Sequence, residues 1–205
     1  NLGYMKQKIC MVGLASGLVL GNLGFTHCSI EEIGVLRSIP NISIVVPSDS
    51  FELFKILQES VNYKNSLYIR LTAGANTRII NSNDYKFKIG KAIEIMSGDD
   101  VAIISCGNIL GNCIDAALSL KKNKISCSVI NMHTIKPIDK KKIVEISKKF
   151  KLIITVEEHN IIGGLGSAVA EVLSGEISSS KLVRIGADDY YSSGGSYEYL
   201  KNIYG

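Results

Sequence analysis

Apolar and polar positions follow two periodic patterns along the chain. Short runs rich in β-branched residues predict buried strands, and longer segments with apolar residues three or four positions apart predict helices. The predicted strands lie at residues 8–14, 41–47, 66–71, 101–105, 127–132, 153–156 and 181–185. The predicted helices lie at residues 30–38, 51–63, 108–122, 139–150, 168–173 and 196–204. Strands that alternate with helices indicate mostly parallel sheets covered by helices on both faces.

The pattern weakens between residues 72 and 86, where glycine, asparagine, serine and aspartate follow one another closely. Such residues favour turns and loops, so this segment predicts a linker. We place a domain boundary at residue 83, with one domain over residues 1–83 and a second over residues 84–205. The expected fold class is α/β, with two consecutive three-layer α/β/α domains whose sheets are mostly parallel.

A glycine-rich turn between residues 152 and 173 joins a predicted strand to a predicted helix. The free amide groups at such a helix start can hold an anion. The turn contains Gly163, Gly164 and Gly166, but it lacks the third glycine of a dinucleotide fingerprint, and no Gly-Lys-Ser/Thr follows. The sequence therefore favours close packing between strand and helix over a nucleotide site.

Charge and hydropathy exclude two classes of partner. The net charge is only +4, and the lysines of residues 121–151 alternate with apolar residues as on solvent-facing helices, with Phe150 as the single interleaved aromatic residue and no arginine. We therefore expect no nucleic-acid partner. Residues 9–25 carry no charge, but four glycines interrupt this segment. It is also shorter than the roughly 20 residues that cross a bilayer, so we expect no membrane span.

The chain contains five cysteines, an odd number, and none of them forms a CxxC pair. Most lie within apolar runs, which is typical of reduced, buried thiols in an intracellular protein. We therefore expect a cytoplasmic location and no structural zinc site.

Several motifs together resemble the transketolase family, and the resemblance covers nearly the whole chain. The sequence GFTH at residues 24–27, the sequence LRSIPN at 36–41 and the sequence VPSD at 46–49 resemble the pyrimidine-binding domain. The sequences NMHTIKPID at 131–139 and VEEHNIIGGLGSAVAEV at 156–172 resemble the C-terminal domain. The latter is most similar to two-subunit transketolases. Residues 1–83 would then be the end of the pyrimidine-binding domain, and residues 84–205 the C-terminal domain.

The resemblance implies a thiamine-diphosphate enzyme that moves a two-carbon ketol unit between sugar phosphates. In this family two chains form each active site, and a separate domain holds the diphosphate through Mg²⁺. The chain begins at Asn1, not at Met, and we expect the family's catalytic glutamate and ring-stacking aromatic residue upstream of it. The family's magnesium–diphosphate motif does not occur in the sequence. We therefore expect a homodimer, a diphosphate-binding partner subunit, or both, with no cofactor bound and no turnover by this chain alone.

Three residues match the family's site residues. His27 matches the histidine that exchanges protons beside the donor sugar, and Thr26 precedes it in the same motif. Such a role suits an imidazole, which titrates near neutral pH. Arg70 lies close to the family's phosphate-binding arginine, and Arg78 is a second candidate. A guanidinium group can bind a phosphate with two hydrogen bonds.

Two positions depart from the family pattern. Leu23 stands where common transketolases carry an aspartate, and Ala15 stands where they carry a histidine that helps to hold the donor. A leucine side chain cannot accept a hydrogen bond, so the substrate, but not the fold, differs from the common pattern. We expect structural or interfacial roles for the remaining acidic and imidazole side chains near the glycine turn and the 131–139 motif: Glu157, Glu158, His133 and His159.

Other functions remain open. The β subunit of a 2-oxoacid dehydrogenase and deoxyxylulose-phosphate synthase share the architecture, although their motifs fit residues 133–139 less well. A non-catalytic assembly module of the same fold is favoured somewhat by Leu23 and Ala15. A nicotinamide-binding oxidoreductase depends only on the glycines at residues 163–166.

Overall fold

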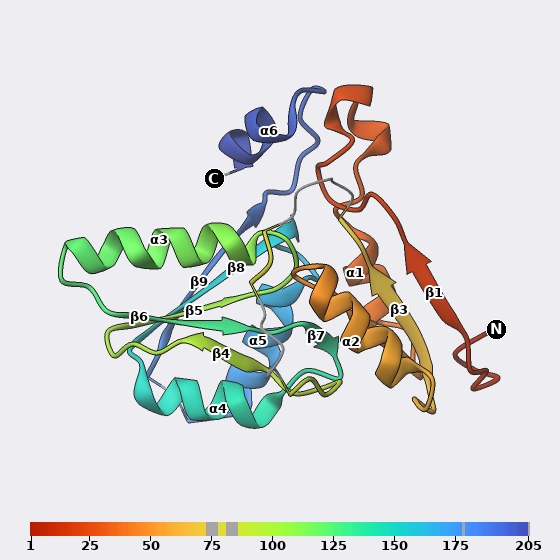
Figure 1. Ribbon diagram of the computed structural model, residues 1–205, viewed down its shortest axis with the longest axis horizontal. Helices are drawn as coiled ribbons and strands as arrows, with labels where there is room; N and C mark the ends of the chain where they lie inside the picture. Colours follow the sequence, from red (N-terminus) through yellow and green to blue (C-terminus); the bar gives the residue numbers. More distant parts are fainter. Residues whose placement is uncertain (73–77, 81–85, 178, 205) are drawn as a thin grey trace.

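The computed structural model describes residues 1–72, 78–80, 86–177 and 179–204. Within these residues the strands form a four-stranded sheet and a five-stranded sheet, with helices packed on both (Figure 1). This is the α/β architecture with mostly parallel sheets that the sequence predicts.

The four-stranded sheet is built mainly from the N-terminal part of the chain. Its strands lie in the order β1 (Cys10–Gly13), β3 (Ser66–Arg70), β2 (Ile42–Val45) and β7 (Thr134–Lys136). The first three are parallel, and β7 pairs with β2 in the antiparallel direction. Because β7 comes from the later part of the chain, it joins the two halves of the molecule through backbone hydrogen bonds.

Helices α1 (Glu32–Arg37) and α2 (Ser50–Ser60) cover opposite faces of this sheet. Ile33 of α1 packs in one buried cluster with Ile44, whereas Ile56 of α2 packs in another with Val45. Adjacent strand residues point to opposite faces of the sheet, so β2 contributes side chains to both clusters. Asp49 accepts a hydrogen bond from the backbone N–H of Glu52 at 2.7 Å, which is the N-terminal cap expected for α2.

The five-stranded sheet belongs to the C-terminal part of the chain. Its strands lie in the order β4 (Ile93–Met96), β6 (Cys127–Asn131), β5 (Val101–Ser105), β8 (Leu152–Asn160) and β9 (Lys181–Ala187). Only β4 runs antiparallel to its neighbour within this sheet. Helix α3 (Leu110–Lys122) covers one face, and helices α4 (Lys140–Lys149) and α5 (Leu165–Ser174) cover the other.

One buried cluster connects the two sheets. It contains Ile33 and Ile44 from the N-terminal part together with Ile104, Ile143 and Val169 from the C-terminal part. Burying apolar surface from both parts in one cluster stabilises them together rather than independently.

Three details differ from the predicted elements. Strands β4 and β7 were not expected, and β8 continues through Glu157 and Glu158, where the sequence predicts that the strand ends. Both carboxylates are buried and hydrogen-bonded within the protein, so they do not force the chain to the surface. The loop before α1 contains two short 3₁₀ helices, η1 (Gly21–Leu23) and η2 (Phe25–His27). The predicted boundary at residue 83 lies outside the described residues.

The C-terminal helix α6 (Tyr197–Tyr204) stands apart from the five-stranded sheet and lies next to the η1–η2 loop (Figure 1). Among the described residues, no helix combines the length and the apolar character required to span a membrane.

Candidate functional site

The candidate catalytic histidine lies on an exposed loop. His27 and the neighbouring Thr26 are both exposed, and the Thr26 Oγ1 and His27 Nδ1 atoms are 3.2 Å apart. Gly24 immediately precedes η2 and has φ of +93°, a backbone conformation that favours glycine. Leu23 is also exposed, immediately before this glycine. The loop therefore presents an imidazole, a hydroxyl group and an apolar side chain to solvent.

Arg70 lies in the interior at the end of β3, with a side chain that is only 3% exposed. Its Nε donates to the Glu32 carboxylate at 2.5 Å, and its Nη2 donates to the backbone oxygens of Ser29 and Glu158 at 3.1 and 2.9 Å. Burial alone would lower the pKa of Arg70, but the Glu32 carboxylate raises it above its usual value. In this arrangement the guanidinium group supports the end of the His27 loop from inside.

Arg78, the second phosphate candidate, is exposed and far less constrained. Its Nη1 forms an ion pair with Asp115 of α3 at 2.7 Å, and both side chains are more than half exposed. Ala15 lies near the other end of the loop and has φ of +56°. Arg78 thus pairs with α3 rather than with the Thr26–His27 pair.

The glycine turn holds a carboxyl group that belongs to the protein itself. The Glu157 carboxylate accepts hydrogen bonds from the backbone N–H groups of Leu165 and Gly166, at 2.6 and 2.7 Å. A Cβ at Gly164 would lie 1.9 Å from the same carboxylate, so only glycine fits there. Burial raises the pKa of Glu157 to about 7, although the two amide donors oppose this. These amide groups are therefore not available to a nucleotide phosphate, which removes the main support for a nicotinamide site.

Glu158 connects the two parts of the chain. One carboxylate oxygen accepts the backbone N–H of Leu18 at 2.8 Å, and the other accepts the hydroxyl of Tyr197 at 2.6 Å. Burial raises the pKa of Glu158, while these donors and Arg70 oppose the shift. The sequence suggested a structural or interfacial role for this residue, and its contacts are of that kind.

The two remaining histidines are buried. The His159 Nδ1 donates to the carbonyl of Asn160 at 2.7 Å, and its Nε2 accepts from the N–H of Gly34 at 3.4 Å. His133 stacks on Phe87 with ring centroids 4.4 Å apart. Burial lowers the pKa of both imidazoles, which favours their neutral forms. Their surroundings differ from those of His27, the exposed member of the set.

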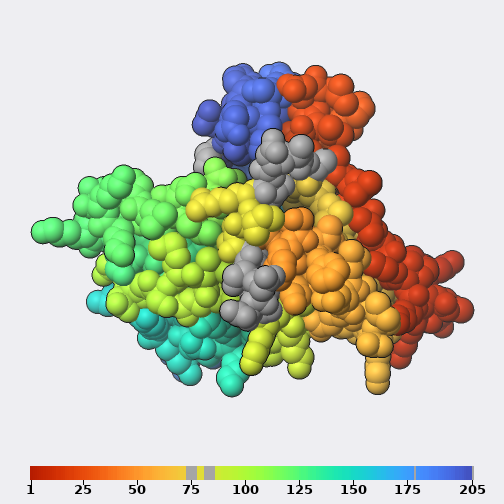
Figure 2. Space-filling view, in the orientation of Figure 1, coloured from red at the N-terminus to blue at the C-terminus, as the bar shows by residue number. Residues whose placement is uncertain are grey.

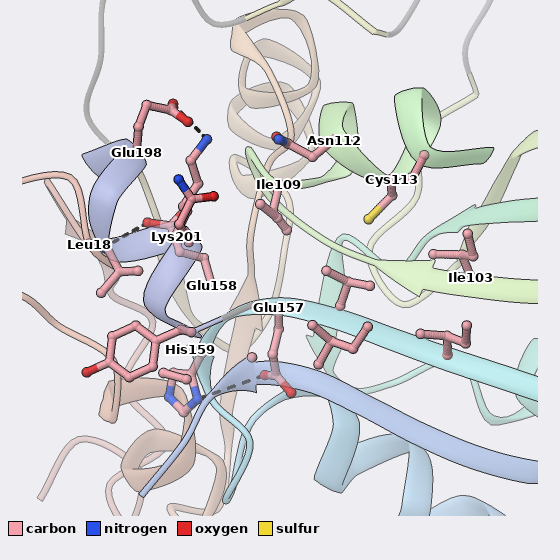
Figure 3. A pocket seen from close by; sticks show the side chains of 18 of the residues that line it. Leu18, Ile103, Ile109, Asn112, Cys113, Glu157, Glu158, His159, Glu198 and Lys201 are labelled. Atoms are coloured by element: carbon pink, nitrogen blue, oxygen red, sulfur yellow. Dashed lines mark hydrogen bonds and ion pairs between the residues drawn. The ribbon is translucent and has the colours of Figure 1, made fainter. Parts of the chain in front are cut away.

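A cavity of about 430 Å³ lies behind the loop, between α3 and α6 and over β8 and β9. Figure 3 shows Glu157, Glu158 and His159 among the lining residues, with the polar side chains of Asn112, Glu198 and Lys201 at the rim and apolar side chains such as Ile103 and Ile109 between them. The carboxylates of Glu157 and Glu158 bond to protein donors, so the cavity is mainly an apolar space. A second cavity of about 200 Å³ lies at the carboxyl ends of β2 and β3, near Ser48 and Asn108.

The described residues bring no cluster of carboxylate, imidazole or thiol side chains together as a metal site. They contain no group of three or more His, Cys, Asp or Glu side chains that could hold a metal ion. The buried carboxylates of Glu157 and Glu158 already accept hydrogen bonds from the protein.

Comparisons with known proteins give matches over both parts of the chain. Residues 1–77 match the model of the family "Transketolase, pyrimidine binding domain". Residues 90–205 match the model "Transketolase, C-terminal domain".

Similar curated proteins carry related names. A putative transketolase C-terminal section of Methanocaldococcus jannaschii is 36% identical over 206 residues, which cover 100% of this chain and 64% of the relative. One of the subunits of an apulose-4-phosphate transketolase of Phocaeicola vulgatus is 33% identical over 97% of this chain and 63% of the relative. A 1-deoxy-D-xylulose-5-phosphate synthase of Caldanaerobacter subterraneus is 35% identical over 91% of this chain and 30% of the relative. The chain thus spans just under two thirds of the first two relatives.

A solved structure supports the same grouping. The protein described as a split gene transketolase, inactive β4 tetramer, is 32% identical, with a TM-score of 0.88 over 98% of this chain and 64% of that one. A transketolase of Pichia stipitis is 20% identical with a TM-score of 0.79, which shows the shared fold.

Proposed function

Because this chain belongs to the transketolase family, we propose that it is one part of a transketolase-type enzyme that moves a two-carbon ketol unit between sugar phosphates. The part that binds thiamine diphosphate and Mg²⁺ is a separate segment or polypeptide. Relatives that are named as single subunits of a transketolase, of which the chain covers just under two thirds, support this division. The similar chain described as an inactive β4 tetramer also supports the proposal that this chain is inactive alone.

The observation that carries the proposal is the exposed Thr26–His27 pair. An imidazole at the surface can reach a substrate bound between this chain and a partner, which the buried His133 and His159 cannot do. His27 exchanges a proton with a hydroxyl or carbonyl oxygen of the sugar, and Thr26 orients the ring through the contact to Nδ1. With Nδ1 directed at Thr26, Nε2 is the nitrogen that faces the substrate.

The substrate contacts in this proposal differ from the common pattern. The exposed Leu23 offers an apolar surface beside His27, and Ala15 offers no polar atom. Arg70 reaches a substrate phosphate only if its bonds to Glu32, Ser29 and Glu158 rearrange. The proposed substrates are still sugar phosphates. This chain would, however, make fewer polar contacts to their hydroxyl groups than a common transketolase does.

We further propose that the domain boundary lies near residue 83, that the complete enzyme is a dimer or contains a diphosphate-binding subunit, and that it works in the cytoplasm. The five cysteines are free thiols, which agrees with a reducing compartment.

The test is to combine the full-length protein with its diphosphate-binding partner, thiamine diphosphate and Mg²⁺, and to measure ketol transfer from a ketose phosphate. His27→Asn removes the proton exchange and should lower kcat by about 10²–10⁴-fold. A matched substitution at an exposed site far from the loop, Tyr4→Phe, should leave kcat unchanged.

The donor separates the competing activities. If no ketose phosphate is a donor and pyruvate is consumed instead, the protein is an enzyme of the synthase or dehydrogenase type. If neither donor reacts although the partner and cofactor bind, the chain is a non-catalytic assembly module.

A further inference from the structure

The η1–η2 loop, residues 21–27, makes few contacts of its own to hold its position. The backbone bonds around His27 are local: the N–H of His27 donates to the carbonyl of Gly24 at 3.0 Å, and the N–H of Cys28 donates to the carbonyl of Phe25 at 3.0 Å. Gly24 has nothing within 4 Å of its Cβ position, so no neighbour restrains it from that side. The location of His27 must therefore depend on contacts from another segment.

That segment is the C-terminal end of the chain, residues 190–204, called the C-terminal segment below. Figure 2 shows the blue C-terminal residues lying directly against the orange-red loop, and the same proximity is visible in Figure 1. Phe25 packs edge-on against Tyr191, with ring centroids 5.1 Å apart, and it is 6.3 Å from the ring of Tyr204. Aromatic pairs at these distances and tilts attract one another.

The backbones of the two segments also touch. The N–H of Gly195 donates to the carbonyl of Gly21 at 3.0 Å. A Cβ at Gly194 would lie 2.9 Å from the Cα of Gly24, which is closer than real Cβ contacts allow. Glycine at position 194 therefore allows the C-terminal segment to approach the start of η2 directly.

Tyr191 contacts the loop on both sides of His27. Its ring meets Phe25, two residues before His27, and its hydroxyl donates to the Glu31 carboxylate at 2.5 Å, four residues after it. The other Glu31 oxygen accepts the backbone N–H of Ile30 at 3.1 Å. Although 69% exposed, Tyr191 thus spans the segment that carries the histidine.

The C-terminal segment is itself fixed to the molecule. The Tyr204 hydroxyl accepts the N–H of Ser192 and donates to the carbonyl of Tyr190, both at 3.0 Å. Leu200 is fully buried, and Tyr197 bonds to the buried Glu158. The segment is therefore anchored well enough to position a loop that packs against it.

We propose that Tyr191, together with Gly194, positions the Thr26–His27 loop, so that the C-terminal domain sets where the catalytic imidazole stands. The proposal rests on the function proposed above for His27. Tyr191 is a positioning residue: it acts through Phe25 and Glu31 and does not itself exchange a proton.

The first experiment measures how readily the loop opens in the full-length protein, and it requires no enzymatic assay. Hydrogen exchange at the amides of residues 25–28 should become at least about tenfold faster in Tyr191→Ala and Gly194→Ala, because opening of the loop becomes easier. Tyr191→Phe, which keeps the ring and loses the bond to Glu31, should give a smaller increase. Tyr4→Ala, a matched change at a tyrosine that is 89% exposed, should give none. Unchanged exchange in both Tyr191→Ala and Gly194→Ala would overturn the proposal.

The second experiment is a double-mutant cycle in the assembled enzyme. Tyr191→Ala should lower kcat by about ten- to a hundredfold with little change in KM, because a small displacement of a catalytic group is costly. In a His27→Asn background the same substitution should have almost no further effect. An equal loss in both backgrounds would mean that Tyr191 only stabilises the fold, and it would refute a link to His27. If the wild-type assembly shows no transfer but exchange responds as expected, the proposed function fails while the loop-positioning role stands.

Discussion

Arg70 shows how a single residue can match a binding motif and yet lie in the protein interior. Its guanidinium group has three described protein partners, one of them a carboxylate, and these partners come from two segments that are far apart in the sequence. Sequence alone identifies an arginine at the end of a strand, but it cannot show which way the side chain turns. The contacts to Glu32, Ser29 and Glu158 depend on packing between distant segments, which local pattern does not encode.

At the residue scale, Arg70→Met should destabilise the protein by about 3–5 kcal/mol, because it leaves the Glu32 carboxylate without its buried partner. Urea unfolding measures this change. Arg78→Met removes an exposed ion pair and should cost less than about 1 kcal/mol. If Arg70→Met leaves stability unchanged and raises only KM for the phosphorylated substrate, the side chain binds phosphate, as the sequence motif suggests.

At the scale of elements, the strand, turn and helix of residues 152–173 were predictable, whereas their closing interaction was not. The run of β-branched residues and the three glycines indicate β8 and α5. The sequence does not show that Glu157, inside the strand, caps the helix that follows it. Strand β7 was missed because three residues are too few to show a period of two, and β4 was missed because it is a partly exposed edge strand whose apolar run is interrupted by Glu94.

The Glu157 cap makes stability depend on pH. A carboxyl group whose pKa rises from 4.5 to about 7 on folding binds its proton more tightly in the folded state. The free energy of unfolding should therefore fall as pH rises through this interval, by up to about 1.4 kcal/mol per pH unit from this group. A glutamine at position 157 cannot titrate. The free energy of unfolding of the wild type minus that of Glu157→Gln should therefore fall steadily from low to high pH.

Urea unfolding at several pH values between 5 and 8 would measure that difference. Glu198→Gln, at an exposed position of α6, serves as the control and should follow the wild-type pH dependence. Parallel pH profiles for wild type and Glu157→Gln would contradict the assignment of the titration to this carboxyl.

At the scale of the whole molecule, the alternation of strands and helices and the family motifs predict the α/β architecture well. The connection between the two parts was not predictable, because it depends on pairing between residues far apart in sequence. Strand β7 pairs with β2, and the Lys136 ammonium group donates to the carbonyl of Arg37 at 2.8 Å. One buried cluster also contains side chains from both sheets.

These connections predict one cooperative unfolding transition. Hydrogen exchange or fluorescence probes placed in β3 and in β5 should report the same urea midpoint, because both sheets contribute side chains to one buried cluster that is lost when either sheet unfolds. Two separate midpoints would show that the parts unfold independently.

The pairing of β7 with β2 also limits how such a gene can be divided. Cutting the polypeptide between the two family regions would strip the N-terminal sheet of its border strand and leave the backbone donors and acceptors of β2 open to any other extended chain. Each product would then be prone to self-association rather than to independent folding. Evolutionary fission or laboratory dissection should therefore succeed only where this border strand remains with the sheet that it completes.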